Sequence, residues 1–244
     1  MGATSTDASL MKASLDLTHV LYDDDSFTSW ALAMVTLSPI LLMASYASLA
    51  VQTREILVIN MWAGQLASET FNFVLKQIFK EPRPDTALGE GYGFPSSHSQ
   101  WMGYFASFLM FHLLYQHRFT PSGYGTTIDR LWLAIVCAGL ASWAGAVAYS
   151  RFALGYHAPH QVGWGALIGV LLGSGWYYVT EVVPRAKSPS GAIVVEWVKA
   201  LRGWEVDNAL SRWVGVRDGW AVWADGGREA EWREWRRLYD RKSA

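Results

Sequence analysis

One stretch decides how this sequence is interpreted, namely Lys76-Gln-Ile-Phe-Lys-Glu-Pro-Arg83-Pro84, followed after a glycine-rich loop by Pro95-Ser96-Ser97-His98. Two cations lie seven residues apart, and a Ser-Ser-His turn then opens an apolar run. The first turn of a helix has free N–H groups and a dipole that favour a bound anion. The stretch therefore indicates phosphate-handling chemistry, although a basic loop beside a membrane helix would contain the same residue types.

The residue types in this stretch suit an anion with several oxygens. Lys76 offers a point charge and Arg83 a planar, five-donor fork. Ser97 stands three residues before Gln100, which is the spacing of a capping box. We therefore expect Ser97 to be the N-cap of the helix, with the N–H groups that follow it directed at the anion.

A second segment has the same character. Ser150-Arg151 is followed by Gly155-Tyr156-His157-Ala-Pro-His160-Gln161, again where one apolar run stops and another begins. A single His after a helix is usually structural. An Arg six residues before a His, after a similar Lys/Arg/His set upstream, favours a shared functional site.

These motifs resemble those of a known superfamily. The chain contains, in this order, Lys-x6-Arg-Pro, Pro-Ser-x-His and Ser-Arg-x5-His. These patterns are similar to the three signature motifs of the type 2 phosphatidic acid phosphatase superfamily. That superfamily also contains the vanadium haloperoxidases. The resemblance covers roughly residues 56–183. It implies an all-α fold, namely a polytopic helical membrane bundle with the core of that superfamily.

Two departures narrow the resemblance. The superfamily usually has Gly where this chain has Ser97, and Asp where it has Gln161. These two departures make the chain resemble the dolichyl diphosphate phosphatases of the endoplasmic reticulum. Three further segments add to this resemblance, namely Glu-Pro-Arg-Pro, Tyr-His-x3-Gln-Val and Leu17-Thr-His-Val20. The implied reaction is hydrolysis of dolichyl diphosphate to dolichyl phosphate and phosphate, which recycles the lipid carrier of protein N-glycosylation.

The resemblance also implies the roles of individual residues. His157 would attack the terminal phosphorus and form a phosphohistidine, and His98 would protonate the leaving lipid phosphate. The phosphate would be held by cations and by groups at the helix start, namely Lys76, Arg83, Arg151, Ser96 and Ser97. Gln161 lies within a turn of His157, so it would either orient the imidazole or only cap the helix.

Composition agrees with a membrane protein. The chain has 244 residues, of which 51% are hydrophobic, and its 14 Trp accompany a formal net charge of -1. This charge and the absence of a basic stripe argue against nucleic acid as a partner. With Cys137 as its only cysteine, the chain cannot form an intrachain disulfide. His157-x-x-His160 has no neighbouring carboxylate in the sequence, so we expect neither a metal nor a cofactor.

The apolar residues are clumped into about five runs that approach the roughly 20 residues needed to span a bilayer. The two motif segments lie between runs two and three and between runs four and five, so both should emerge on one face. Glu69 within the second run should be a structural partner of Lys76 or Asn72. The runs are about Trp30–Val51, Glu55–Ile78, Gln100–Tyr115, Leu131–Tyr149 and His160–Val183.

These patterns predict three regions, namely a polar segment (1–29), a membrane-embedded phosphatase domain (30–183) and a Trp/Arg-rich tail (184–244). The tail contains 12 Lys/Arg and 9 Asp/Glu, and its aromatic residues recur at helical spacing. It should lie among lipid headgroups as amphipathic helices, or else pack on the bundle as a helical appendage. The positive-inside rule makes the tail cytoplasmic and the motif loops lumenal.

Three other functions share part of this pattern. A vanadate-dependent haloperoxidase would use the same cations and histidines, but five spans favour an apolar substrate. A phosphatidate phosphatase or a bacterial-type undecaprenyl diphosphate phosphatase would share the whole mechanism. A non-catalytic lipid-binding protein would not require both histidines.

Overall fold

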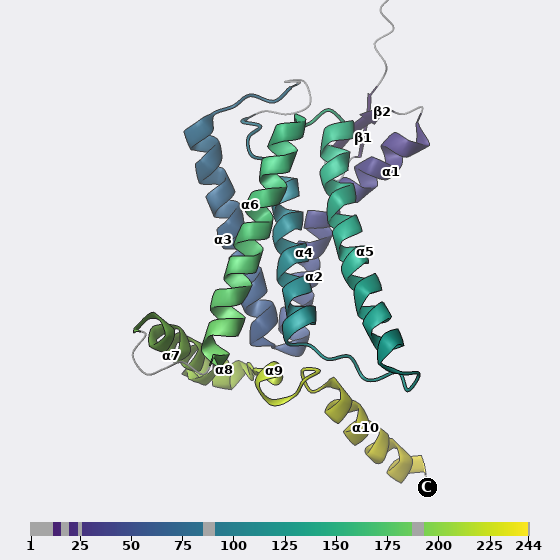
Figure 1. Cartoon of the computed structure of the whole chain (residues 1–244), viewed down its shortest axis with the longest axis vertical. Coiled ribbons are helices and arrows are strands. Elements are labelled where there is room, and N and C mark those ends of the chain that lie inside the picture. Colours follow the sequence, from purple (N-terminus) through teal and green to yellow (C-terminus); the bar gives the residue numbers. More distant parts are fainter. Residues whose placement is uncertain (1–11, 16–19, 24–25, 85–90, 187–192, 244) are drawn as a thin grey trace, which may run out of the picture.

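A computed structural model of the chain describes residues 12–15, 20–23, 26–84, 91–186 and 193–243. Long helices lie with their axes roughly aligned and form a bundle in which successive helices alternate in chain direction (Figure 1). Further helices lie across one end of the bundle. The predicted all-α helical bundle is therefore confirmed. A two-stranded antiparallel hairpin near the N-terminus, β1 (Lys12–Leu15) and β2 (Val20–Asp23), was not predicted by the sequence pattern.

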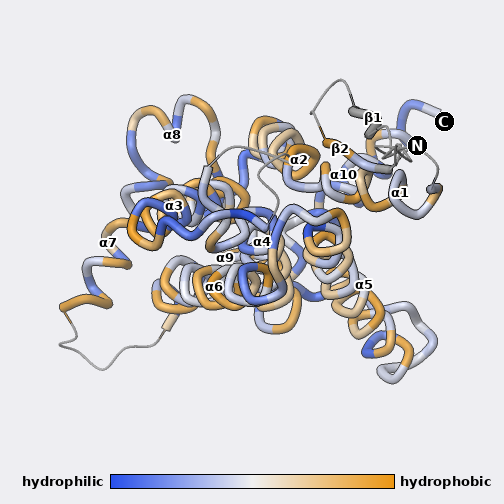
Figure 2. Tube along the Cα trace, turned by 90° about the horizontal axis from the view of Figure 1, so that it is seen from above, coloured by the Kyte–Doolittle hydropathy of each residue, from blue (hydrophilic) through white to orange (hydrophobic). Residues whose placement is uncertain are grey.

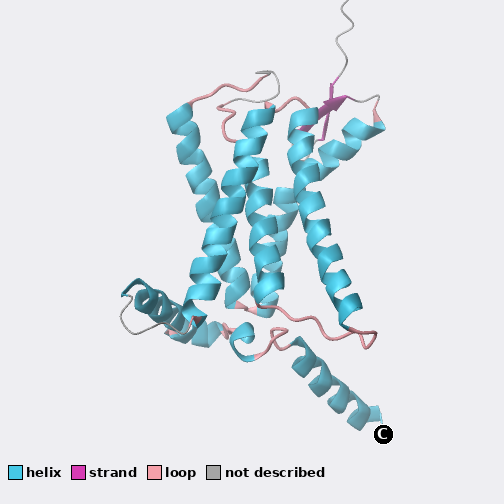
Figure 3. Ribbon diagram, in the orientation of Figure 1, coloured by secondary structure: helices cyan, strands magenta, loops and turns pink. Residues whose placement is uncertain are grey.

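The bundle contains α1 (Phe27–Thr36), α2 (Ser38–Thr53), α3 (Ile56–Phe79), α4 (Ser97–Tyr115), α5 (Thr126–Ala153) and α6 (Pro159–Tyr177). The helix α6 continues through a π-helical turn (Tyr178–Val182) and a 3-10 turn (Val183–Arg185). The elements that follow are α7 (Ile193–Asp207), α8 (Ala209–Val214), α9 (Gly219–Val222) and α10 (Arg228–Ser243) (Figure 3).

The first apolar run is divided into two helices rather than forming one. The helix α1 ends at Thr36, and α2 begins at Ser38 with Pro39 in its first turn. Proline has no N–H to continue the preceding helix, and its ring clashes with the carbonyl group four residues earlier, here that of Val35. The direction of the chain changes at this point (Figure 1).

Close approach of α4 and α6 depends on glycine. A Cβ on Gly169 would lie 2.1 Å from the carbonyl oxygen of Gln100, and one on Gly173 would lie 2.4 Å from that of Tyr104. Small residues at such positions allow helices to pack closely within lipid. Gly165 lies equally close to α4, with its Cβ position 2.5 Å from the carbonyl oxygen of Ser96, whereas Gly163 and Gly175 face open space.

Three helical segments are long and apolar enough to cross a membrane, which makes the chain a multi-pass membrane protein. They are Phe27–Thr53, Thr126–Ala153 and Pro159–Arg185. The helices α3 and α4 coincide with the other two predicted spans but contain more polar residues, so the count of five spans stays a prediction. Hydrophobic residues occur along the bundle helices, and the segment after α3 is hydrophilic (Figure 2).

The two motif segments meet at one end of the bundle, as expected. The end of α3, the start of α4, the end of α5 and the start of α6 lie at this end, together with the hairpin (Figure 1). The helices α7 to α10 lie at the opposite end. Ion pairs join α7 to the turn after α6 and to the start of α9: Arg202 of α7 contacts Glu181 at 3.2 Å and Asp218 at 2.9 Å.

The aromatic residues of α7 and α10 recur at helical spacing and are exposed. Trp197 is 73% exposed and Trp232 is 59% exposed. The tail thus combines ion-paired attachment to the bundle with exposed aromatic side chains of the kind found at membrane interfaces.

Candidate active site

Lys76 and the Ser-Ser-His turn are joined directly. The Lys76 ammonium donates to the Ser97 hydroxyl at 2.6 Å, and that hydroxyl donates to Asn72 Oδ1 at 3.0 Å. The helix α4 begins at Ser97, so its N-cap is Ser96, which makes no side-chain capping bond. The expected capping box is therefore wrong, because the Ser97 side chain is held by Lys76 and Asn72 instead.

Gln100 has a different partner from the one expected. Asn72 Nδ2 donates to Gln100 Oε1 at 2.8 Å, and Gln100 Nε2 donates to the Ser68 carbonyl oxygen at 2.7 Å. All three of these side chains are buried. They form a satisfied polar network that fixes the start of α4 against α3, which positions Ser97 beside Lys76.

Arg151 lies at the end of α5 and is held by an aromatic ring. Its guanidinium carbon is 3.8 Å from the centre of the Tyr156 ring, and Tyr156 OH accepts from the N–H of Leu21 at 2.8 Å. The hairpin therefore supports Tyr156, and Tyr156 supports Arg151. Buried Nε atoms of Arg151 and Arg83 have no hydrogen-bond partner among the described residues, which leaves donors for an anion.

His157 begins a chain of side-chain contacts that reaches the first motif. Its Nδ1 lies 3.1 Å from Gln161 Oε1, and Gln161 Nε2 donates to Glu81 Oε1 at 2.6 Å. The side chain of Gln161 also accepts from the N–H of Ala158 at 3.3 Å. The two roles considered for Gln161 therefore coexist, since it contacts the imidazole and caps α6. His157 and Gln161 are 3% and 1% exposed.

These contacts fix the tautomer of His157. Gln161 Nε2 faces two acceptors, a Glu81 carboxylate oxygen and the Pro82 carbonyl oxygen at 3.1 Å, so its amide oxygen must face His157. An oxygen can only accept, which places a proton on Nδ1 of a neutral His157. The lone pair is then on Nε2, the nitrogen a nucleophile would use.

The environment of His157 favours its neutral form. Burial is the main cause that lowers the pKa of His157, and the positive charge of Arg151 lowers it further, to about 3, against the opposing effect of the Gln161 hydrogen bond. Arg83 and Lys76 act in the same direction as Arg151. All three predicted cations therefore lie within electrostatic reach of one imidazole.

His98 lies in the first turn of α4 within electrostatic reach of His157, Arg151, Lys76 and Arg83. The first-turn N–H groups of Ser97, His98 and Ser99 have no intrahelical acceptor. The N–H of Ser96 differs, because it donates to the Gln161 carbonyl oxygen at 3.1 Å. A phosphate contact from the Ser96 N–H would require this bond to open, whereas the next three N–H groups are available.

Glu81 was not predicted from the sequence. It lies in the first motif and accepts hydrogen bonds from Gln161 and His160. Glu81 Oε1 is 2.6 Å from His160 Nε2, so His160 does have a carboxylate neighbour, which the sequence did not suggest. Burial raises the pKa of Glu81, but the hydrogen bonds from Gln161 and His160 outweigh it and lower the pKa overall. No three described His, Cys, Asp or Glu residues form a metal-binding group.

Glu69 lies within electrostatic reach of Lys76, its predicted partner, but makes no direct polar contact with it. Among the described residues it has no ion pair or hydrogen bond with Lys76 or Asn72, because Ser97 binds Lys76 and the polar network binds Asn72. The segment Leu17-Thr-His-Val20 falls outside the described residues except for Val20, which is buried. Asn72, Gln100 and Tyr156 are further site residues that the motifs did not identify.

Comparison with known proteins identifies the family to which the chain belongs. The model of the PAP2 superfamily matches residues 56–184. Dolichyldiphosphatase 1 of Mus musculus is 35% identical over 68% of this chain and 71% of its own length. A putative dolichyldiphosphatase of Neurospora crassa is 33% identical over 91% of each chain, and the dolichyldiphosphatase of Saccharomyces cerevisiae is 33% identical over 69% and 70%. No solved structure matches the chain.

Proposed function

From the premise that this chain belongs to the PAP2 superfamily and is related to its dolichyldiphosphatases, we propose that it hydrolyses dolichyl diphosphate to dolichyl phosphate and inorganic phosphate. The observation that carries the proposal is the arrangement around His157, a neutral buried imidazole with its Nδ1 on Gln161 and three cations within electrostatic reach. Such an arrangement suits nucleophilic attack on a highly charged phosphorus centre.

The reaction proceeds in two steps. In the first, Nε2 of His157 attacks the terminal phosphorus, the bond from that phosphorus to the bridging oxygen breaks, and His98 gives a proton to the departing dolichyl phosphate. In the second, His98 takes a proton from water, the water oxygen bonds to phosphorus, and the bond to Nε2 breaks to release phosphate. Histidine suits both roles because a neutral imidazole is a nucleophile and an imidazolium is a proton donor.

Lys76, Arg83 and Arg151 stabilise the phosphoryl oxygens while the charge redistributes. The otherwise unbonded Nε atoms of Arg83 and Arg151 support this role, as do the N–H groups at the start of α4. Ser97 holds the Lys76 ammonium in place at 2.6 Å and offers its own N–H to the phosphate. Preorganised charges of this kind usually supply the largest share of a rate enhancement.

Glu81 acts through Gln161 as a positioning residue. Its carboxylate can only accept, so it holds the Gln161 amide in the orientation that keeps a proton on Nδ1 of His157. The negative charge is separated from the imidazole by one amide group. His157 is thus oriented as it would be by an acidic neighbour. It has no carboxylate hydrogen-bonded to it, which would favour its protonation.

The site would face the lumen of the endoplasmic reticulum in a five-span arrangement. Residues 30–183 would form the membrane-embedded phosphatase domain, with residues 1–29 and the tail 184–244 as its flanks. Positive residues gather at the end opposite to the motifs, which the positive-inside rule assigns to the cytoplasm. In sealed right-side-out microsomes, added protease should cut the tail. Protection of the tail until the membranes are permeabilised would reverse the orientation.

A turnover assay tests the proposed reaction. The purified chain should release phosphate from dolichyl diphosphate in the presence of EDTA, and phosphatidate in equal amount should compete weakly. Preferential hydrolysis of phosphatidate would assign the chain another lipid substrate. Loss of activity in EDTA with recovery in Mg²⁺ or Zn²⁺ would contradict the metal-free mechanism. If the chain hydrolysed neither lipid, the alternative of a non-catalytic lipid-binding protein would be favoured.

A further inference from the structure

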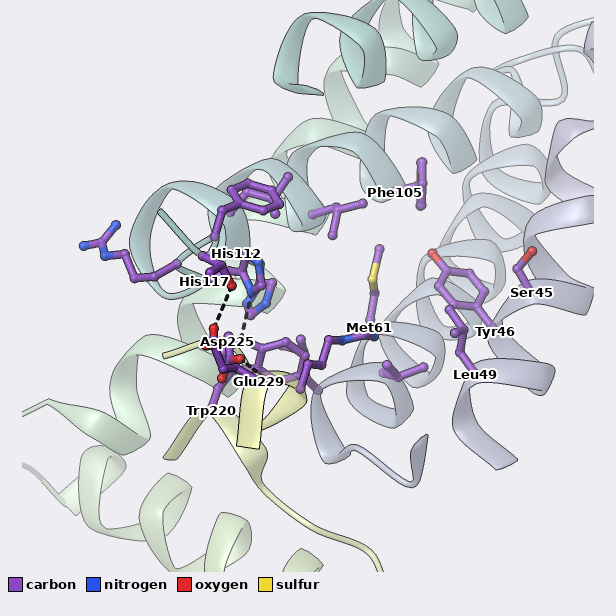
Figure 4. Close-up of a pocket in the computed structure, with 18 of the residues that line it drawn as sticks. Ser45, Tyr46, Leu49, Met61, Phe105, His112, His117, Trp220, Asp225 and Glu229 are labelled. Carbon is purple, nitrogen blue, oxygen red and sulfur yellow. Dashed lines mark hydrogen bonds between the residues drawn. The ribbon is translucent and has the colours of Figure 1, made fainter. Parts of the chain in front are cut away.

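A cavity of about 960 Å³, drawn in Figure 4, extends from Phe105 in the middle of α4 to Trp220 of α9, which lies at the end of the bundle opposite to the candidate active site. Its wall consists mainly of apolar side chains from α2, α3 and α4, such as Leu49, Met61 and Phe105, and Trp220 of α9 closes it near His112 and His117. This volume is near the upper end of the roughly 300–1,000 Å³ typical of ligand pockets. The cavity is therefore large enough for hydrocarbon chains.

A smaller polar hollow of about 350 Å³ adjoins the cavity. The two spaces share Trp220 and Arg228 in their walls, and the hollow is lined further by Arg54, Arg217 and Glu55. An apolar cavity that continues into a polar hollow has the shape and polarity of an amphiphile. Chains would occupy the first space and a headgroup the second.

The linings of the two spaces together contain four arginines and four carboxylates, so a preference for an anion depends on which arginines lack an ion pair. Arg54, Arg118 and Arg228 are exposed, and none forms an ion pair with a described carboxylate. The acidic groups nearby already have donors, as Arg217 contacts Glu55 at 2.6 Å and also pairs with Glu231. Similarly, Glu229 contacts Arg233 at 2.7 Å, and Asp225 accepts from the N–H groups of Gly227 and Glu229.

We propose that this end of the bundle binds a glycerophospholipid with an anionic headgroup. Its acyl chains would lie in the cavity beside Leu49 and Phe105, and its phosphate would contact Arg228, with Arg118 and Arg54 on either side. Arginine favours phosphate through paired hydrogen bonds. Basic pockets between membrane helices are a known means of holding anionic lipids. The lipid would also bridge α2–α4 and the tail, since Trp220 and Arg228 belong to the tail.

The lipid substrate of the proposed reaction does not fit these charges. The helix α4 has 19 residues and therefore spans about 28 Å from the candidate active site to this end. A substrate with its diphosphate beside His98 would place only hydrocarbon near Arg118 and Arg228. The proposed ligand is therefore a second lipid, whose headgroup lies at the opposite membrane surface.

Native mass spectrometry of the full-length chain in detergent tests this proposal. The probes are phosphatidylglycerol and phosphatidylcholine with the same acyl chains. The variant Arg118→Gln/Arg228→Gln removes both arginines that line the apolar cavity. The matched control Arg130→Gln/Arg241→Gln removes the same charge from exposed arginines that line neither space. Ser45→Trp places a large ring in the cavity wall without changing charge.

The wild-type chain should bind phosphatidylglycerol at least about tenfold more tightly than phosphatidylcholine, since each surface cation favours an anionic lipid. The first variant should lose this preference and the control should keep it, whereas Ser45→Trp should weaken binding of both lipids. Equal binding of the two lipids to the wild-type chain, or a preference that survives in the first variant, would overturn the proposal. So would unchanged binding in Ser45→Trp, or displacement of phosphatidylglycerol by equimolar dolichyl phosphate.

Discussion

Replacing Gln161 by Asp should make the activity sensitive to mild acid. In the present structure a neutral amide oxygen lies 3.1 Å from Nδ1 of His157, and the pKa of His157 is lowered to about 3 by burial and by Arg151. An Asp side chain would bring a full negative charge to about 4 Å. At an effective dielectric constant of about 20, that charge stabilises the imidazolium by about 4 kcal/mol.

This energy corresponds to an upper limit of about 3 pKa units, and opposite charges at such distances usually shift a pKa by about 1–3 units. The pKa of His157 should therefore rise to between about 4 and 6. A higher pKa means that His157 becomes protonated, and loses its nucleophilic lone pair, at a higher pH. The acid limb of kcat/KM should move upward, because kcat/KM reports the free enzyme.

The control is Gln161→Asn, which has the length of Asp but no charge. The assay measures kcat/KM of both variants on dolichyl diphosphate from about pH 4 to pH 8. Dividing one profile by the other cancels the ionisation of the substrate. The ratio of Asp variant to Asn variant should fall as the pH decreases below about 6. A ratio that does not depend on pH would refute the claim that Gln161 sets the protonation of His157.

The other predictions concern the remaining parts of the account. In Glu81→Gln the side-chain amide of Gln161 can exchange the positions of its oxygen and nitrogen, so kcat should fall about tenfold with KM little changed, as expected for loss of a hydrogen bond to a charged group. A normal kcat would show that Glu81 does not position Gln161. His157→Ala and His98→Ala should each lower turnover at least about 10²-fold without loss of folding, measured by melting temperature, and near-normal turnover of either would cancel its assigned role. Gly169→Ala should destabilise the chain by about 1–3 kcal/mol because its Cβ would overlap Gln100. Gly163→Ala in the same helix meets open space and should be neutral or slightly stabilising, and equal melting temperatures for the two variants would refute the close-packing argument.

The sequence predicted the parts of the site that depend on spacing. Runs of apolar residues predicted the bundle, and their order along the chain predicted that Lys76, His98 and His157 would meet at one end. Chain reversal between successive antiparallel helices is enough to bring such loops together, so no detailed knowledge of packing was required.

Contacts that depend on side-chain direction could not be predicted in this way. Glu81 and Gln161 are 80 positions apart in sequence, and their hydrogen bond exists only because the loop after α3 lies across the start of α6. The capping box failed for a similar reason, because Lys76 and Asn72 from another helix bind the Ser97 hydroxyl. The support of Tyr156 by the hairpin also depends on tertiary structure, whereas the break at Pro39 has a local cause in the sequence.

Trapping the phosphorylated enzyme tests the central claim most directly. The chain is mixed with dolichyl diphosphate carrying ³²P in its terminal phosphate, quenched within one turnover, and digested into peptides. The account predicts label that is stable to base, labile to acid and located on His157, with none in the His157→Ala variant. Label on another residue, or single-turnover release of phosphate with no labelled enzyme at any time point, would contradict it.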